Sequence, residues 1–171
     1  MAKNVVLIGL MGCGKSTVAA ILSDKLKMKF IDTDSLIVQK EERSINEIFA
    51  QSGEAYFREI ETQLIKEVSA DFDCIISTGG GIVERSGNLE YLKQNGIVFY
   101  LKTSVQTLYE RLKNQSDRPL LKTENPYETL KGLLEKRENK YFLADITIET
   151  DNKNPDKIVG EIIEAYEKQS A

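Results

Sequence analysis

The fold is decided by the stretch GLMGCGKS, residues 9–16, which matches the pattern G-x-x-x-x-G-K-[S/T] at every fixed position. An apolar run at residues 5–8 comes directly before it, and an amphipathic stretch at residues 18–26 follows it. A strand, a glycine-rich loop and a helix in this order predict a phosphate-binding loop, because glycines let backbone N–H groups approach phosphate oxygens closely. The start of the helix adds positive potential at the same place. The sequence therefore predicts a nucleotide-binding site in segment 9–17.

Two side chains of this loop have predicted roles of their own. Lys15 is expected to reach the terminal phosphates of the nucleotide, and Ser16 is expected to bind Mg²⁺. Cys13 occupies a free position of the pattern, where we expect a small, tolerated side chain without a catalytic or redox role. The nucleotide-binding residues predicted within the loop are Gly12, Cys13, Gly14, Lys15, Ser16 and Thr17.

Short apolar runs alternate with longer amphipathic stretches along the chain. The runs expected to form strands lie at residues 5–8, 30–31, 74–77, 97–101 and 146–148. Several lack polar alternation, as expected for parallel strands covered on both faces. Helix starts are indicated by capping boxes at 44–47 and 103–106 and by Asn-Pro pairs at 125–126 and 154–155. The alternation predicts an α/β fold with helices on both faces of a parallel sheet, in a single domain over residues 1–171.

The composition excludes several kinds of site. The chain has 171 residues, a formal net charge of −4 and no histidine. The lack of histidine excludes His-based metal sites and Ser-His-Asp triads, and the mild negative charge argues against a surface that grips nucleic acid or anionic lipid. Cys13 and Cys74 form no C-x-x-C pair, which favours a reducing, cytoplasmic setting. No apolar run approaches membrane-spanning length and the start lacks a cleavage pattern, so we expect a soluble intracellular protein.

Two aspartates, Asp32 and Asp34, follow the second expected strand in the stretch FIDTDSL, residues 30–36. If residues 30–32 form a strand beside the phosphate-binding loop, we expect both carboxylates to project to the same side and Thr33 to the other. Ligands of open α/β sheets bind beyond the carboxyl ends of the strands, so both carboxylates are expected near the terminal phosphate. One would hold the hydration shell of Mg²⁺, and the other would accept a hydrogen bond from an incoming hydroxyl. Turn or helix-cap chemistry is the alternative.

The third expected strand runs directly into three glycines, in the stretch CIISTGGG at residues 74–81. Consecutive glycines cost conformational entropy and offer no packing, so a bare loop is one interpretation. We favour the other interpretation, in which Gly79, Gly80 and Gly81 let the backbone approach a ligand closely.

Two arginines occupy unusual positions on expected helices. Arg137 falls on the apolar stripe of stretch 126–141, and a charge on an inward-facing line needs a partner because its desolvation is costly. A core salt bridge or a bound anion would each supply that partner. Arg58 and Glu61 lie three residues apart on the flank of another apolar line, where an ordinary surface pair and a functional pair are both open.

One polar stretch, NQSDRPLLKTEN at residues 114–125, interrupts the alternation between two helical patterns. Its composition fits a simple connector. Its length and the presence of Arg118 fit a lid over the site equally well.

Taken in order, these motifs resemble the shikimate kinase family. The likeness rests on the phosphate-binding loop, DTD at 32–34, FREIE at 57–61, STGGG at 77–81, RPLL at 118–121 and R-x-x-x-Y at 137–141. Each later motif is weak alone, but the ordered set follows the family's spacings over essentially the whole chain. The resemblance implies a P-loop kinase fold, α/β/α in three layers, with a five-stranded parallel sheet and a lid. It also implies transfer of the γ-phosphoryl group of ATP to the 3-hydroxyl of shikimate, on the pathway to chorismate and aromatic amino acids.

Carried over by position, the resemblance implies a role for each candidate residue. The implied catalytic residues are Lys15, Asp34 and Arg118. Arg111, Arg118 and Pro155 would join the loop in binding the nucleotide, and Ser16 and Asp32 would hold the metal. The implied substrate-binding residues are Asp34, Phe49, Phe57, Arg58, Glu61, Gly79, Gly80, Gly81 and Arg137, with region 32–62 contributing most of them.

Among these residues the resemblance implies a division of labour. Arg58 and Arg137 would bind the shikimate carboxylate, Glu61 would hold Arg58, and Asp34 would bind the accepting hydroxyl. ATP and shikimate are the implied substrates and Mg²⁺ is the implied cofactor. We expect a monomer without a nucleic-acid or membrane partner.

Two other functions compete with this interpretation. A related small kinase acting on gluconate or a nucleoside monophosphate would share the loop, but the two arginines with the DTD and GGG motifs favour a compact acid. A GTP-dependent switch would need the pattern N-K-x-D. The stretch 152–154 begins this pattern, but Pro155 stands where the aspartate belongs, and no D-x-x-G occurs.

Overall fold

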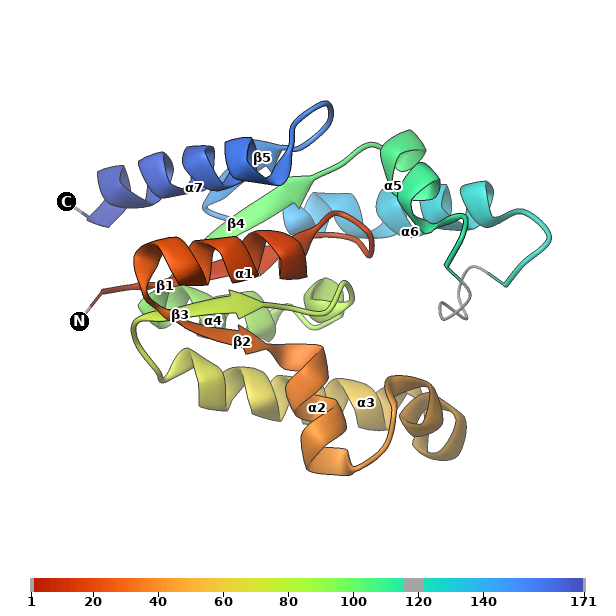
Figure 1. The fold of residues 1–171 in the computed structure, drawn as a ribbon. Helices are drawn as coiled ribbons and strands as arrows, with labels where there is room; N and C mark the ends of the chain where they lie inside the picture. The colour runs from red at the N-terminus through yellow and green to blue at the C-terminus, as the bar shows by residue number, and fades with distance from the viewer. Residues whose placement is uncertain (1, 116–121, 171) are drawn as a thin grey trace.

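The computed structural model describes residues 2–115 and 122–170 of the chain. A sheet of five parallel strands forms the centre of this described part, in the order β2-β3-β1-β4-β5 (Figure 1). The strands are β1 (Asn4–Ile8), β2 (Lys29–Asp32), β3 (Cys74–Ser77), β4 (Gly96–Lys102) and β5 (Ile146–Glu149). Each begins and ends within one residue of its predicted position. The predicted α/β fold is therefore confirmed.

Helices cover both faces of the sheet, which gives three layers (Figure 1). The helices are α1 (Lys15–Leu26), α2 (Thr33–Glu41), α3 (Ile45–Ser69), η1 (Ile82–Glu84), α4 (Gly87–Asn95), α5 (Val105–Leu112), α6 (Pro126–Tyr141) and α7 (Pro155–Ser170), of which η1 is a 3-10 helix. α1 and α7 pack together on one face, and α3 and α4 pack together on the other. α6 contacts α5 and η1. This last contact brings α6 to the loop that follows β3.

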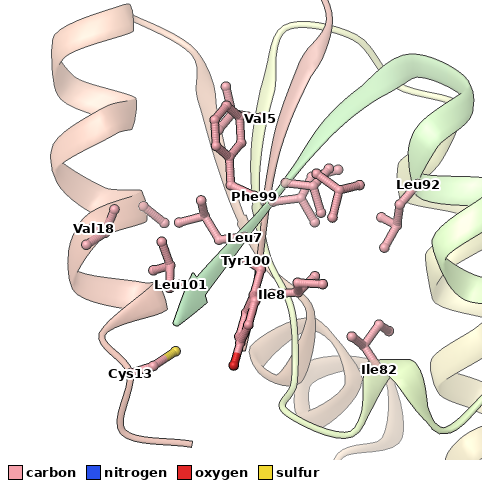
Figure 2. Packing of buried hydrophobic residues seen from close by; sticks show 14 of the residues in the cluster. Val5, Leu7, Ile8, Cys13, Val18, Ile82, Leu92, Phe99, Tyr100 and Leu101 are labelled. Carbon is pink, nitrogen blue, oxygen red and sulfur yellow. The ribbon is translucent and has the colours of Figure 1, made fainter. Parts of the chain in front are cut away.

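The central strands are buried on both sides, which accounts for their unbroken apolar sequence. All residues of β1 are buried, and β1 pairs with β4 from Asn4 opposite Gly96 onward. In Figure 2, Val18 of α1 and Leu92 of α4 lie on opposite sides of the strands. Because the strands are parallel, their carboxyl ends meet at one edge of the sheet, where the loops that carry the candidate residues begin.

The predicted helix starts are confirmed in three places and shifted in one. Ser44 and Glu47 form the predicted capping box, and Asn125 and Asn154 cap the helices that begin at the following prolines. The fourth prediction, a capping box at 103–106, is wrong by one residue. Ser104 is the cap, with its Oγ accepting a hydrogen bond from the N–H of residue 107. The Thr103 hydroxyl is instead buried, 2.6 Å from that of Thr150.

Gly53 divides α3 into two helical segments. Its φ of 83° and ψ of 171° lie outside the helical region. The segment before it carries Phe49, and the segment after it carries Phe57 and Arg58. The kink therefore sets the angle between side chains that the sequence predicts to act on one substrate.

Two expectations about the whole chain can be compared with the fold. Within residues 2–115 and 122–170, no helix is long and apolar enough to cross a membrane. Cys13 and Cys74 are buried free thiols.

Candidate functional site

A groove of about 500 Å³ lies at the carboxyl edge of the sheet, beside the starts of α1 and α7. It collects segments that are far apart in sequence: the loop after β1, the end of β2, the glycines after β3 and the start of α7. The predicted site residues in its lining are Gly12, Cys13, Gly14, Lys15, Ser16, Thr17, Asp32, Asp34, Gly79, Gly80, Arg111 and Pro155. The groove thus unites residues 11–17 of the predicted loop with both aspartates.

The loop presents a cation and the open start of a helix to this groove. The Lys15 Nζ donates to the carbonyl oxygens of Gly9, at 2.7 Å, and Leu10, at 3.2 Å, and lies 3.5 Å from the Cys13 Sγ. α1 begins at Lys15, and its cap residue Gly14 has a φ of 96°, which favours glycine. No side-chain oxygen caps this start, so its N–H groups are available to an anion in the groove.

Asp32 both caps a helix and faces the groove, which are the two roles that the sequence left open for it. Its Oδ1 accepts a hydrogen bond of 2.9 Å from the Ser35 N–H and caps α2. Its Oδ2 accepts a hydrogen bond of 3.0 Å from the Ser16 Oγ–H in the groove. One carboxylate therefore both starts a helix and faces the phosphate-binding loop.

The predicted geometry of Asp34 is wrong, although its location in the groove is right. β2 ends at Asp32, and Asp34 lies in the first turn of α2, so strand alternation does not align the two carboxylates. The reason is the cap at Asp32, which starts the helix immediately after the strand. A Cβ added at Gly79 would lie 2.7 Å from the Asp34 Oδ1, so the carboxylate rests directly against the glycine backbone.

The oxygen atoms of Ser16 and Asp32 suit a hard divalent cation such as Mg²⁺. Mg²⁺ prefers oxygen ligands and is usually held by one or two carboxylates together with substrate phosphates and waters. The Ser16 hydroxyl and the Asp32 carboxylate both line the groove and lie in contact. These two residues are therefore the ones that could hold the ion beside a nucleotide.

Arg58 and Glu61 form a buried ion pair, so the interpretation as an ordinary surface pair is wrong. The Arg58 side chain is 11% exposed, that of Glu61 is 1% exposed, and the Arg58 Nη1 lies 2.8 Å from the Glu61 Oε2. Burial raises the pKa of the Glu61 carboxyl, although the charge and hydrogen bond of Arg58 act to lower it. A Cβ added at Gly81 would lie 2.3 Å from the Arg58 Nη2. The guanidinium of α3 therefore lies against the third glycine.

Arg137 forms a core salt bridge, which was one of the two partners that the sequence left open for its inward-facing charge. Its side chain is 7% exposed, and its Nε donates a hydrogen bond of 2.7 Å to the Glu84 Oε1. This contact uses one of the five N–H donors of a guanidinium, so an anion remains a possible second partner. One turn further along α6, the Tyr141 hydroxyl donates to the Gly80 carbonyl at 2.5 Å. Glu84 was missed by sequence reasoning, because no spacing rule connects it with a residue of α6.

Phe49 and Phe57 form a small aromatic surface next to Arg58. Their ring centroids are 4.8 Å apart, and Phe57 lies under the Arg58 guanidinium, 5.2 Å from the ring centroid. Phe57 is buried, whereas Phe49 is exposed. This arrangement can cover one side of a small ring, and it depends on the kink between the two segments of α3.

Comparison with known proteins decides the family. The shikimate kinase family model matches residues 11–167. This chain belongs to the shikimate kinase family. The shikimate kinase of Sulfurihydrogenibium sp. (strain YO3AOP1) is 48% identical over 161 residues, which cover 94% of this chain and 96% of that one. The shikimate kinase of Thermodesulfovibrio yellowstonii is 42% identical over 168 residues, which cover 98% and 97%.

Solved shikimate kinases have the same fold as this chain. A shikimate kinase from Acinetobacter baumannii in complex with shikimate superposes with a TM-score of 0.93 at 36% identity. The match covers 99% of this chain and 95% of that chain. The predicted family, the P-loop kinase fold and the enzyme class are thus confirmed: the chain is an ATP-using kinase of the shikimate pathway.

The groove is also lined by residues outside the loop and the two aspartates, some predicted and some not. The Arg111 Nη1 donates to the Gly12 carbonyl at 3.1 Å, and Pro155 opens α7 at the groove wall. Lys153 and Gln115 also line the groove and were not predicted. Lys153 lies within the stretch 152–154 that was considered only as a guanine-binding pattern. Arg118, with the rest of the RPLL motif at 118–121, lies outside the described residues, as does half of the predicted lid 114–125.

Proposed function

We propose that the groove of this shikimate kinase brings ATP and shikimate together, so that the γ-phosphoryl group passes to the 3-hydroxyl. The products are shikimate 3-phosphate and ADP. The observation that carries the proposal is that Lys15 and Asp34 line one groove. The glycine backbone at 79–81, which Asp34 touches, also contacts α6 and Arg58 of α3. A phosphate-binding cation and side chains suited to a hydroxylated acid are therefore neighbours.

At the nucleotide end, the backbone N–H groups of the loop and the Lys15 ammonium would bind the phosphates. Arg111 and Pro155, which both line the groove, would lie on either side of the base, as the family resemblance implies. Ser16 and Asp32 would hold Mg²⁺, which supplies positive charge to the phosphate oxygens when it is bound. The oxygen contact between these two residues supports their pairing in this role.

At the acceptor end, Arg58 and Arg137 would bind the carboxylate of shikimate. A planar guanidinium matches a carboxylate through two parallel hydrogen bonds, so arginine suits this task better than lysine. Glu61 would hold Arg58, and Phe49 and Phe57 would cover the ring. Gly79, Gly80 and Gly81 would approach the substrate through their backbone, since close neighbours leave little room for a side chain at Gly79 and Gly81.

Asp34 would bind the accepting hydroxyl at the point where the two ends meet. Phosphoryl transfer needs alignment of the reacting oxygens and neutralisation of spreading negative charge more than covalent chemistry. Asp34 would align the hydroxyl and accept its proton, and Lys15 would neutralise charge on the transferred group. Arg118, carried by a lid at 114–125, would add charge and exclude water.

We propose a monomeric, cytoplasmic enzyme that uses ATP and Mg²⁺. The buried free thiols of Cys13 and Cys74 agree with a reducing setting. Size-exclusion chromatography with light scattering would check the monomer, and a dimer mass would contradict it.

An ADP-release assay across shikimate, gluconate, AMP and UMP tests the reaction. We expect turnover with shikimate and only background with the other three acceptors. Turnover with a nucleotide but not with shikimate would reject the proposed acceptor. A preference for GTP over ATP in binding measurements would favour the switch instead.

A further inference from the structure

Glu84 is the last residue of a short turn that the core holds rigidly. The two residues before it, Ile82 and Val83, are buried. The Glu84 N–H donates to the Gly81 carbonyl at 3.0 Å, and the buried Asn88 side chain donates to the Ile82 carbonyl at 2.9 Å. The Glu84 carboxylate therefore extends from a fixed point, three residues beyond the last glycine of the substrate loop.

The two oxygens of this carboxylate face different partners. Oε1 accepts the hydrogen bond from the Arg137 Nε, and Oε2 lies 4.0 Å from the Lys136 Nζ and 3.8 Å from the Lys140 Nζ. Burial acts to raise the pKa of the Glu84 carboxyl, but the hydrogen bond and charge of Arg137, aided by both lysines, outweigh it, and the pKa is lower than usual. Glu84 is therefore an ionised, well-held acceptor at neutral pH.

Engagement of the Nε restricts the orientation of the whole guanidinium. The group is planar with its donors in a fixed fork, so a bond at Nε limits rotation at the end of the side chain. The terminal Nη1 and Nη2 edge then points in one direction. That edge has the geometry for two parallel hydrogen bonds to a second carboxylate. The Tyr141 side chain, one turn further along α6, also interacts with the Arg137 guanidinium.

We propose that Glu84 is a positioning residue, which holds the Arg137 guanidinium in the orientation that receives the substrate carboxylate. The proposal rests on the proposed function, in which Arg137 binds that carboxylate. The opposite role is a competing internal carboxylate, which would weaken substrate binding. Positioning is favoured because Glu84 engages the side of the fork at Nε rather than its terminal edge, and comes from a rigid turn.

Steady-state kinetics of Glu84→Gln, Glu84→Asp and Glu84→Ala test the proposal. Gln keeps an acceptor oxygen at the same reach, Asp keeps the charge but withdraws the oxygen, and Ala removes both. We expect Ala and Asp to raise the KM for shikimate about tenfold, and Gln to raise it no more than about threefold. The kcat and the KM for ATP should stay within about twofold of the parent values.

The matched control is Glu59→Gln, which removes the charge of another glutamate–arginine pair. Glu59 lies 2.8 Å from the Arg85 Nη1, and both side chains are substantially exposed. This variant should leave both KM values within about twofold. Thermal melting of every variant checks folding, and Glu84→Asp or Glu84→Gln supplies the measurement if Glu84→Ala does not fold.

Arg137→Lys separates this inference from the proposed function. An unchanged KM for shikimate in Arg137→Lys would remove Arg137 from the acid site, and the proposed function would lose that assignment. Suppose that the KM for shikimate rises in Arg137→Lys but stays at the parent value in Glu84→Ala and Glu84→Asp. This result would overturn the positioning role of Glu84 and leave the proposed function standing.

A KM for shikimate that falls in the Glu84 variants would also overturn the positioning role, because it would show that the Glu84 carboxylate competes with the substrate carboxylate. If Glu84 acts through Arg137, its loss should matter little once Arg137 is replaced. In the Arg137→Lys background, Glu84→Ala should therefore raise the KM for shikimate by a further factor of less than about two.

Discussion

The two ends of the groove are built in different ways. The phosphate end is one continuous segment, in which the loop at 9–17 passes from β1 directly into α1. The proposed acid end would take Asp34 from the groove lining, and Arg58 and Arg137 from α3 and α6 beside it, around the glycines at 79–81. Phosphate oxygens can be bound by the backbone of one loop, whereas a compact acid needs side chains that converge from several directions. Changes at the first end should therefore affect nucleotide use, and changes at the second should affect the acid.

The largest effect is expected at the phosphate end, from Lys15→Ala. Loss of the ammonium removes charge that stabilises the transferred phosphoryl group, so kcat should fall about a thousandfold. The ammonium also bonds to its own loop, so thermal melting must show that the chain still folds. A folded variant with full activity would contradict the assignment of the phosphate end.

Asp34→Asn tests the point where the two ends meet. The amide keeps the shape of the side chain but cannot accept the hydroxyl proton, so kcat should fall about a hundredfold. Both KM values should change little, because the variant leaves the loop and the arginines intact. A KM effect on shikimate without a kcat effect would make Asp34 a binding residue of the acid end alone.

Gly81→Ala tests the acid end through steric contact. The added methyl would overlap the Arg58 guanidinium, which must move away, and we expect the KM for shikimate to rise about tenfold. The KM for ATP should not change, since Gly81 is not in the lining shared with the loop. Gly132→Ala is the control, because no atom lies within 4 Å of a Cβ at this α6 position. If Gly81→Ala and the parent protein had the same KM for shikimate, the observed position of the Arg58 guanidinium would not matter for shikimate binding.

The smallest effect is expected in the free energy of unfolding, to which the Glu84–Arg137 ion pair makes a contribution that depends on pH. The pKa of Glu84 in the folded chain lies below the usual 4.5, so the stability from this pair is present above that pH and is lost as the pH falls through the folded value. Urea unfolding should find Glu84→Gln less stable than the parent by about 1 kcal/mol at pH 7. The difference should shrink below pH 4.5, and a difference that grows there would reverse the sign assigned to this pair.

Much of the phosphate end could be predicted, because its physics is local. A strand, a loop with glycines in set places and a lysine next to a helix start are all encoded within about fourteen consecutive residues. The strand positions were also predictable, since continuous apolar runs are typical of strands buried on both faces. Asp34 shows the limit: the cap at Asp32 starts α2 directly after the strand, so Asp34 has helix geometry, although its predicted location in the groove was right.

The proposed residues of the acid end came from the family resemblance, which included Glu61 as the partner of Arg58 but not Glu84 as the partner of Arg137. The sequence left a core salt bridge or a bound anion open for Arg137, and a surface or functional pair open for Arg58. The structure buries Arg58 with Glu61 and pairs Arg137 with Glu84. It also places Gly81 against the Arg58 guanidinium. Only the Arg58–Glu61 contact leaves a pattern, its three-residue helical spacing, and that spacing does not tell whether the pair is buried.

The sequence by itself determined the parallel α/β sheet and the phosphate-binding loop, because both follow from neighbours along the chain. Only the tertiary structure decided which carboxylate holds Arg137, since Glu84 lies 53 residues away in sequence. A buried charge is costly unless a partner of opposite charge lies in close contact with it. The packing of α6 against η1 supplies that contact between Arg137 and Glu84.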